Sequence, residues 1–354
     1  MQPKQISLNK FNIQFNIFHP FKLFKILKSK FHILIILFFA FNTIVAKAQT
    51  PDIKPLYVFS WDNDFLNIVG KGTDKYYSGG LKFEVLYKNK RTKNCITDKA
   101  LLTFRADTNK IYSWSVTQKT FTPEDIKRTV MYDGDWPYAA GLYLSHNVFS
   151  VNNKKNIAIR SGFDVGVLGP SAFGGEVQSW LHGVIHYARP QGWSHQINNT
   201  LILNFNEAIE PKLFATQNLE IIGNAEADFG TTLNSTKMGI QVRLGKLNDY
   251  FAPKAGNKQI FLTYSFNANW VLYDAYLEGG LFDKTNLKES TRLEYKLSSS
   301  EINNFYFENK ASLNLIFKNW SFIYTQTYTT PQTKRTDEHS YGNVSFFFKI
   351  NNFL

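Results

Sequence analysis

The sequence has a single cysteine, Cys95, among its 354 residues. One thiol cannot form a disulfide within the chain, and it cannot supply a cysteine-based zinc site. The sequence also lacks the Gly-x-Ser-x-Gly elbow of α/β-hydrolases and the His-Glu-x-x-His zinc motif. After residue 48, no stretch approaches the roughly 18 consecutive apolar residues that a membrane-spanning helix needs. A stable fold must therefore come from side-chain burial, or from strands that cross a membrane.

The first 48 residues contain no aspartate or glutamate. They carry seven lysines, the apolar run 33–45 (ILIILFFAFNTIV) and then Ala46-Lys47-Ala48. A basic region, a short apolar core and a small-x-small site are typical of a secretory signal peptide. We expect cleavage after Ala48, so that 1–48 is the signal peptide and 49–354 is the mature domain. An uncleaved membrane anchor is the alternative, although the apolar run is short for one.

The net charge of +12 comes mostly from this leader. Without it, the chain has 33 basic and 28 acidic residues, a net charge of +5. The positive total is therefore no argument for nucleic acid binding, and we predict no nucleic acid partner. No linker rich in proline, glycine or serine divides 49–354, which indicates one domain.

Aromatic residues are abundant, with 32 Phe and 18 Tyr. Many fall on one face of alternating segments. In 260–272, one parity reads Ile, Leu, Tyr, Phe, Ala, Trp and Leu, whereas the other reads Phe, Thr, Ser, Asn, Asn and Val. The same alternation recurs in 305–318 and 344–350. A period of two over such lengths indicates long strands with one apolar and one polar face.

We predict about twelve strands, an even number that suits bacterial outer-membrane barrels. A soluble β-sandwich shows the same alternation, but its strands are usually shorter. We therefore predict an all-β fold, a twelve-stranded antiparallel transmembrane β-barrel with lipid outside and polar residues in the lumen. The predicted strands are 55–65, 78–90, 110–121, 138–149, 156–167, 196–209, 213–229, 232–246, 259–275, 303–318, 320–330 and 340–350.

One segment, 173–187 (FGGEVQSWLHGVIHY), loses the period of two and gains helical spacing. Gly174 and Gly175 lie at its start, and Pro190 follows its end. Gln178 and His182 are four residues apart, which places them on one face of a helix. We predict a short helix between two strands that either plugs the lumen or covers a site.

Two polar stretches flank the first predicted turn. Residues 61–64 (WDND) end the first strand, and 74–81 (DKYYSGGL) lead into the second. Carboxylate and amide oxygens suit a hard cation such as calcium, and a nearby hydroxyl can hydrogen-bond a reacting group. The alternative is an ordinary solvated hairpin, in which Asp, Asn and Gly are common.

Six motifs in a fixed order resemble the outer-membrane lipid A 3′-O-deacylase family (the LpxR family). Each motif is weak alone, but the six together are fairly specific and cover nearly the whole mature chain. They are Asn63-Asp64, 76–81 (YYSGGL), 118–123 (QKTFTP), 135–140 (DWPYAA), 166–170 (GVLGP) leading into 178–182 (QSWLH), and 192–196 (GWSHQ).

The resemblance implies an outer-membrane barrel enzyme that uses calcium to remove an ester-linked acyl or acyloxyacyl chain from lipid A. The implied partners are lipid A or lipopolysaccharide and outer-membrane lipids, and we expect a monomer. By position, the family's site residues fall on Asn63, Asp64, Ser78, Gln178 and His182. Ser78 stands where members have Thr or Ser.

The family's basic site residue falls on Lys127 or Arg128, and we prefer Lys127 because it retains the amine. With these assignments, His182 is the expected base for water, since a histidine pKa can lie near neutrality. Asp64 is the expected calcium ligand, and calcium would polarise the ester carbonyl. Asn63, Ser78 or the cation would hydrogen-bond the oxyanion or a lipid phosphate.

Two other functions remain open at this point. A porin or lipid-binding barrel would share the fold, but it has no need for the Asn-Asp, Ser and Gln-x-x-x-His set. A secreted β-sandwich would share the alternation. Asp62, beside the proposed site, is expected to be a bystander.

Overall fold

The computed structural model describes residues 55–69, 74–88, 100–104, 109–129, 133–251, 258–281 and 294–349. The predicted signal peptide and Cys95 lie outside these residues. All described residues belong to one compact unit, 49–354.

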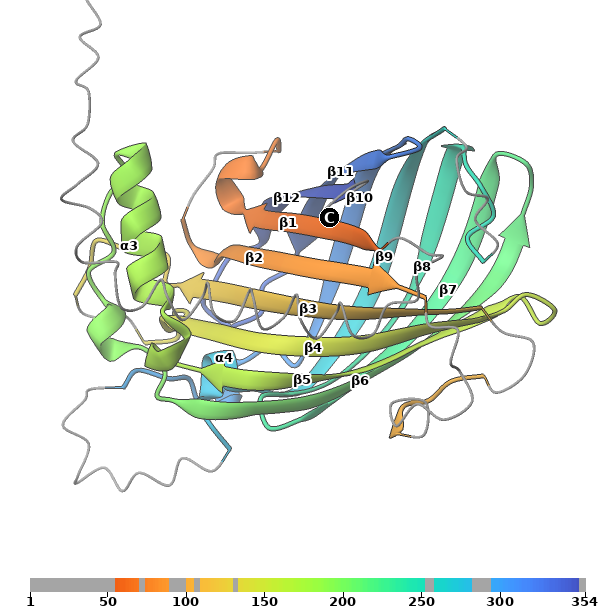
Figure 1. Cartoon of the computed structure of the whole chain (residues 1–354). Coiled ribbons are helices and arrows are strands. Elements are labelled where there is room, and N and C mark those ends of the chain that lie inside the picture. The colour runs from red at the N-terminus through yellow and green to blue at the C-terminus, as the bar shows by residue number, and fades with distance from the viewer. Residues whose placement is uncertain are drawn as a thin grey trace, which may run out of the picture. The chain divides into compact units, whose positions relative to one another are not determined.

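Twelve antiparallel strands form a closed barrel, in which each strand pairs with its sequence neighbours and β12 pairs with β1 (Figure 1). The predicted fold is confirmed, and each strand overlaps the segment predicted for it. The strands are β1 (Leu56–Asn63), β2 (Tyr76–Tyr87), β3 (Asn109–Thr122), β4 (Ala139–Asn152), β5 (Ile157–Leu168), β6 (Thr200–Ala215), β7 (Leu219–Gly230), β8 (Leu233–Lys246), β9 (Gln259–Asp274), β10 (Phe305–Ile316), β11 (Trp320–Thr329) and β12 (His339–Phe348).

Within the residues that the structure describes, the helical segments are short and lie between strands. The longest is α3 (Gly174–Ile185), which confirms the helix predicted at 173–187. Within the described residues, no helix is long and apolar enough to cross a membrane. The others are α4 (Ala275–Glu278), η2 (Asp64–Leu66), η3 (Pro170–Ala172), η4 (Trp193–His195) and η5 (Ser299–Glu301).

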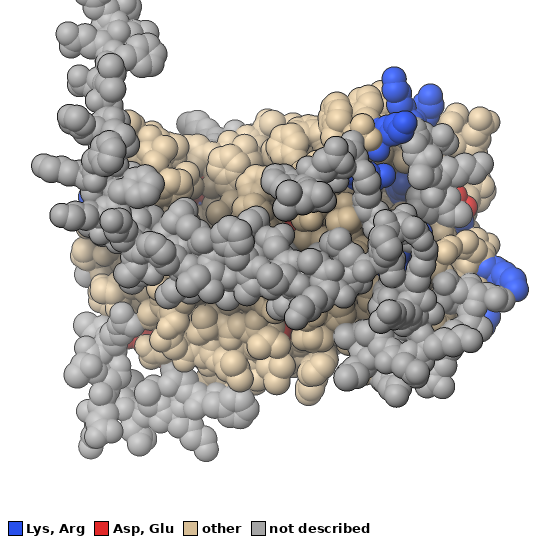
Figure 2. All heavy atoms as spheres, viewed as in Figure 1, with Lys and Arg blue, Asp and Glu red and all other residues tan. Residues whose placement is uncertain are grey.

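The outer face of the barrel is apolar where the alternation predicted it. On β9, the side chains of Ile260, Leu262 and Tyr264 are exposed, whereas Thr263 and Asn267 of the other parity are buried. Figure 2 shows that Lys and Arg on the described part of one face gather at one end, while its middle is largely free of charge. An uncharged apolar wall is what contact with lipid requires.

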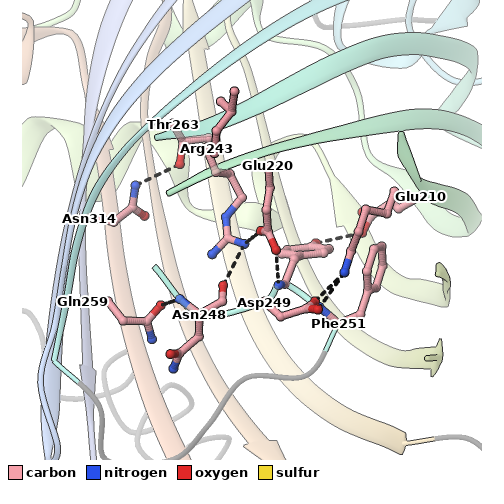
Figure 3. A network of polar contacts seen from close by, with 12 residues as sticks. Glu210, Glu220, Arg243, Asn248, Asp249, Phe251, Gln259, Thr263 and Asn314 are labelled. Atoms are coloured by element: carbon pink, nitrogen blue, oxygen red, sulfur yellow. Dashed lines mark hydrogen bonds and ion pairs between the residues drawn. The ribbon is translucent and has the colours of Figure 1, made fainter. Parts of the chain in front are cut away.

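A polar network fills the lumen near the β8–β9 connection (Figure 3). Arg243 of β8 forms an ion pair with Glu220 of β7, and both are buried. Glu220 Oε1 also accepts from Tyr250 N at 3.1 Å, and Asn248 N donates to Gln259 Oε1 at 2.8 Å. The charged pair thus holds the segment after β8 inside the barrel.

The same segment inserts an apolar side chain into the lumen. Phe251 is only 2% exposed and packs against Val151, Ala158 and Ile222. Near it, the hydroxyl of Tyr250 donates to Glu210 at 2.7 Å. Ordered burial of this kind fills space that a porin leaves to water.

Loops also pack over the opposite end of the lumen. Trp136, Leu277, Leu297 and Ile302 form a buried cluster there with Tyr76. A cavity of about 700 Å³ remains on the lumen side of this cluster, and Lys237, Glu308 and Lys310 are among its lining residues. The lumen is therefore filled by side chains toward both ends.

We expect the purified protein to show no steady ion conductance in planar bilayers, since both ends of the lumen are packed. Arg243→Ala removes the ion pair with Glu220 that holds the inserted segment, and it should produce frequent channel openings. Lys237→Ala is the matched control, because Lys237 pairs with Glu226 on the same two strands but lies in the cavity. Steady conductance by the unmodified protein would contradict this account of the lumen.

Candidate active site

The candidate site begins on the outer wall of the barrel at the end of β1. Asp62 lines the lumen, where it accepts from the Tyr77 hydroxyl at 2.7 Å and from Asn343 Nδ2 at 2.6 Å. Asn63, the next residue, has the opposite parity and therefore faces outward with Phe59. The bystander assignment of Asp62 is consistent with this placement.

A β-bulge in β2 turns Ser78 to the same outer side. Tyr77 pairs with Phe121 and Gly79 pairs with Thr120, so Ser78 is the extra residue between them. Its Oγ lies 2.9 Å from Thr122 Oγ1. Because the Thr122 hydroxyl donates its proton to Asp74 O at 3.1 Å, the Ser78 hydroxyl is the donor in this pair. Bulges of this kind re-aim side chains beside functional sites.

The helix α3 lies at the end of the barrel where β3 ends and β4 begins (Figure 1). Gln118, on the outward parity of β3, donates to Ala172 O at 2.6 Å, just before the helix begins. Gly174 starts the helix against β4, where a Cβ would overlap the Cβ of Ala140. Glycine is therefore needed for helix and wall to approach this closely.

Asp74, Gln178 and His182 form the centre of the site between wall and helix, and all three are buried. Gln178 Nε2 donates to both carboxylate oxygens of Asp74, at 3.1 and 3.2 Å. His182 Nε2 lies 2.9 Å from Asp74 Oδ2. The indole N–H of Trp193 donates to Gln178 Oε1 at 2.9 Å, which orients the amide.

The end of α3 returns the chain to the imidazole of His182. His186, the C-cap residue, adopts the left-handed conformation with φ of 58°, a position where glycine is most common. Tyr187 N then donates to His182 O at 2.9 Å, and His182 Nδ1 lies 2.5 Å from Ala188 O. Both ring nitrogens of His182 are thus engaged.

The geometry around His182 and the direction of its pKa shift both indicate that it is paired with Asp74. Burial lowers the pKa of this imidazole, but the hydrogen bonds to Asp74 and to Ala188 O outweigh burial, so the pKa lies above the ordinary 6.5. A carbonyl can only accept, so Nδ1 carries a proton, and Nε2 is the ring nitrogen that faces Asp74. The contact with Asp74 therefore favours the protonated form of His182.

Asn63 and Asp64 form the neighbouring part of the site. Asp64 is fully buried, and its Oδ2 accepts from Lys75 N at 3.1 Å. Asn63 Oδ1 accepts from Phe65 N at 2.8 Å, and its Nδ2 donates to Ser78 O at 3.1 Å. These contacts link the end of β1 to the start of β2.

The structure therefore brings together most of the residues predicted from sequence. Asn63 contacts Ser78, Gln178 and His182 contact Asp74, and the Asp64 carboxylate is hydrogen-bonded to the residue after Asp74. The set of site residues predicted from the sequence omitted three residues: Asp74, Thr122 and Trp193. Asp74 stood within the polar stretch 74–81, but its spacing gave no sign of its partners.

The predicted cation is not joined to this cluster by the contacts of the described residues. Lys127 is exposed, and its backbone N–H donates to Asp125 Oδ1 at 3.0 Å. Arg128 is paired with Asp125 at 3.0 Å. Among the residues that the structure describes, no group of three or more His, Cys, Asp or Glu side chains is arranged to hold a metal ion.

Comparisons with known proteins give a family and a fold. The sequence matches the family model described as outer membrane protein LpxR over residues 33–350. Its structure is similar to that of LpxR from Salmonella typhimurium, with 19% identity, a TM-score of 0.66, and coverage of 84% of this chain and 100% of that chain. No curated protein matches the sequence.

Two further solved barrels are much less similar. One is the β domain of the Bordetella autotransporter BrkA, with 8% identity, a TM-score of 0.41, and coverage of 84% of this chain and 99% of that chain. The other is an outer membrane channel from Pseudomonas putida F1, with 8% identity, a TM-score of 0.42, and coverage of 86% and 97%. Similarities this low support no inference about function.

The His182–Asp74 pair predicts a titration. We expect NMR of the labelled imidazole to give a pKa above 6.5, and Asp74→Asn to lower it because the paired carboxylate is lost. The pair stabilises the fold below the unfolded-state pKa of histidine, and this stabilisation is lost as the pH rises through the higher folded-state pKa. Asp62→Asn, which changes a lumen carboxylate, should leave the pKa of His182 unchanged. An equal shift in both variants would contradict the pairing.

Proposed function

The chain belongs to the family of outer membrane protein LpxR, and on this premise we propose that it is an ester hydrolase acting on lipid A. The reaction removes an ester-linked acyl or acyloxyacyl chain from a lipid in the outer leaflet. The observation that carries the proposal is the buried Asp74–His182 pair on the outer wall of the barrel. Acid–base groups on that side lie next to lipid, which is where the scissile ester of a lipid would be.

Proton transfer is assigned to His182 with Asp74. A neutral imidazole that keeps Nδ1–H on Ala188 O has a lone pair at Nε2, so it no longer donates to Asp74. In that form, Nε2 can take a proton from the water that attacks the ester, and the resulting imidazolium can give this proton to the alcohol oxygen that leaves when the ester bond breaks. Gln178, fixed by Trp193, positions the Asp74 carboxylate.

Asn63 is assigned to the oxyanion. Its amide has two N–H groups, and one donates to Ser78 O. The second N–H is available to stabilise negative charge on the carbonyl oxygen of the substrate. The Ser78 hydroxyl donates to Thr122, which in turn donates to Asp74 O, so Ser78 is assigned to holding the Asp74 segment in place.

Calcium is proposed as the cofactor, with Asp64 as a ligand. The fully buried carboxylate of Asp64 is a hard oxygen donor of the kind that calcium prefers. Because the described residues offer no larger carboxylate cluster, the remaining ligands would be backbone, water or substrate oxygens. When bound, calcium would polarise the ester carbonyl as a Lewis acid. The basic residue remains assigned to Lys127, as a contact for a lipid phosphate.

The alternative function, a porin or passive lipid-binding barrel, is less well supported. Packed side chains fill both ends of the lumen, whereas a porin keeps an open aqueous channel. A passive barrel also gives no reason to bury Asp74 and His182 together outside the lumen.

Replacing the proposed base provides the first test. We expect His182→Gln to lower acyl release from lipid A by about 100-fold or more, since general acid–base catalysis contributes about that much. The measurement is mass spectrometry of lipid A in vesicles, together with heat-modifiable migration to verify the folded barrel. His186→Asn is the matched control, because His186 lies one turn away, is exposed, and adopts a left-handed conformation that Asn tolerates. Full activity of His182→Gln would exclude the assigned base.

Metal removal provides the second test. Chelation should abolish the loss of one acyl or acyloxyacyl group, and added calcium should restore it. Asp64→Asn should raise the calcium concentration needed for half-maximal activity, because a neutral amide binds calcium more weakly than a carboxylate. Asp62→Asn should leave that concentration unchanged. Full activity in excess chelator would remove calcium from the proposal, and an unchanged lipid A spectrum under every condition would remove the hydrolase itself.

A further inference from the structure

Exposed apolar side chains lie beside the site, on η2 and the residues that follow it. Phe65 of η2 is 44% exposed, and Ile68 and Val69 beyond it are more exposed still. On α3, Trp180 and Val184 are also exposed, but they lie on the helix face opposite to Gln178 and His182. Exposed apolar groups beside a polar site mark a contact surface for an apolar ligand.

Two aromatic rings connect this surface to His182. The ring of Phe65, the residue after Asp64, meets the ring of Tyr187 edge-on at 5.0 Å. Tyr187 in turn meets the imidazole of His182 edge-on at 5.2 Å. The Phe65–Tyr187 contact therefore joins η2 to the segment that follows α3. Both rings are partly exposed, so they can touch a ligand that reaches the imidazole.

The outer wall offers an apolar path from the lipid-facing belt to this pair. Phe59 of β1 pairs with Phe83 of β2, and their rings lie 5.0 Å apart on the outside of the barrel. Four residues further along β1, Asn63 pairs with Gly79. Gly79 has no side chain to cover the backbone beside Asn63. Gly79 therefore does not obstruct the outer wall next to the proposed oxyanion donor.

The occupant that fits this path is a lipid acyl chain. It is long and apolar, it already lies in the membrane, and it can reach the site along the wall without crossing water. We infer that Phe65 and Tyr187 bind the acyl chain next to the scissile ester and determine which chain lengths are hydrolysed. The inference rests on the proposed hydrolase function, which it deepens by naming the acyl contact.

The Tyr187 ring, rather than its hydroxyl, makes the contact. Burial raises the pKa of Tyr187, and the charges of Asp74 and Asp64 raise it further, so the hydroxyl stays neutral. Tyr187→Phe keeps the ring and its edge contacts with Phe65 and His182. It is therefore the conservative variant that should retain activity and selectivity.

Kinetics with lipid esters of graded acyl length test the inference. Phe65→Ala and Tyr187→Ala should raise KM about tenfold for the preferred chain, equivalent to about 1.4 kcal/mol of lost binding, with a smaller change in kcat. They should also flatten the dependence of kcat/KM on chain length, whereas Tyr187→Phe and the distant wall variant Ile260→Ala should not. Equal loss of kcat for every chain length would indicate a merely structural role and overturn the inference.

A capture experiment tests the contact without relying on activity. A photoreactive benzoylphenylalanine at position 65, in the full chain carrying His182→Gln, is illuminated in vesicles of lipid A and phosphatidylethanolamine. We expect adducts at 65 to be enriched in lipid A, and adducts at 305, on the exposed wall of β10, to follow the vesicle composition. Equal composition at both positions, or capture of a protein at 65, would overturn the inference. Enrichment at 65, together with no acyl release by the protein that retains His182, would support the contact and overturn only the hydrolase.

Discussion

Closure of the sheet is the constraint on which the rest of this structure depends. In lipid, every backbone N–H and C=O must be hydrogen-bonded within the protein. The pairing of β1 with β12, from Tyr57–Phe348 to Asn63–Gly342, removes the last free edge. Closure also assigns each strand residue to lipid or to lumen, because a slip of one residue would exchange the two faces.

The candidate site depends on two local departures from regular geometry. The bulge at Ser78 moves its hydroxyl to the outer side, where it supports Asp74 through Thr122. The left-handed C-cap of α3 at His186 folds the next two residues back onto His182. Each departure costs some backbone stability, and each places a polar group where the wall alone would not.

The buried charges of the lumen have a structural role, whereas those of the outer wall have the proposed catalytic role. Inside, charged pairs such as Arg243–Glu220 are buried with their partners and hold a chain segment in place. On the outside, Asp74 and His182 are buried together. Among the described residues of the outer wall, this is the acid–base pair to which we assign the chemistry. The barrel thus provides a rigid scaffold, and the proposed reaction takes place on its surface, where a lipid substrate needs no channel.

The sequence by itself determined the barrel and the helix, because alternation and helical spacing report local geometry. The period of two in 260–272 predicted the two faces of β9, and the spacing of Gln178 and His182 predicted their common helix face. Asp74 could not be assigned in this way, since 104 residues separate it from Gln178. Only the tertiary structure decided that Asp62 faces the lumen while Asn63 joins the site, because closure and the packing of α3 on the outer wall set those contacts.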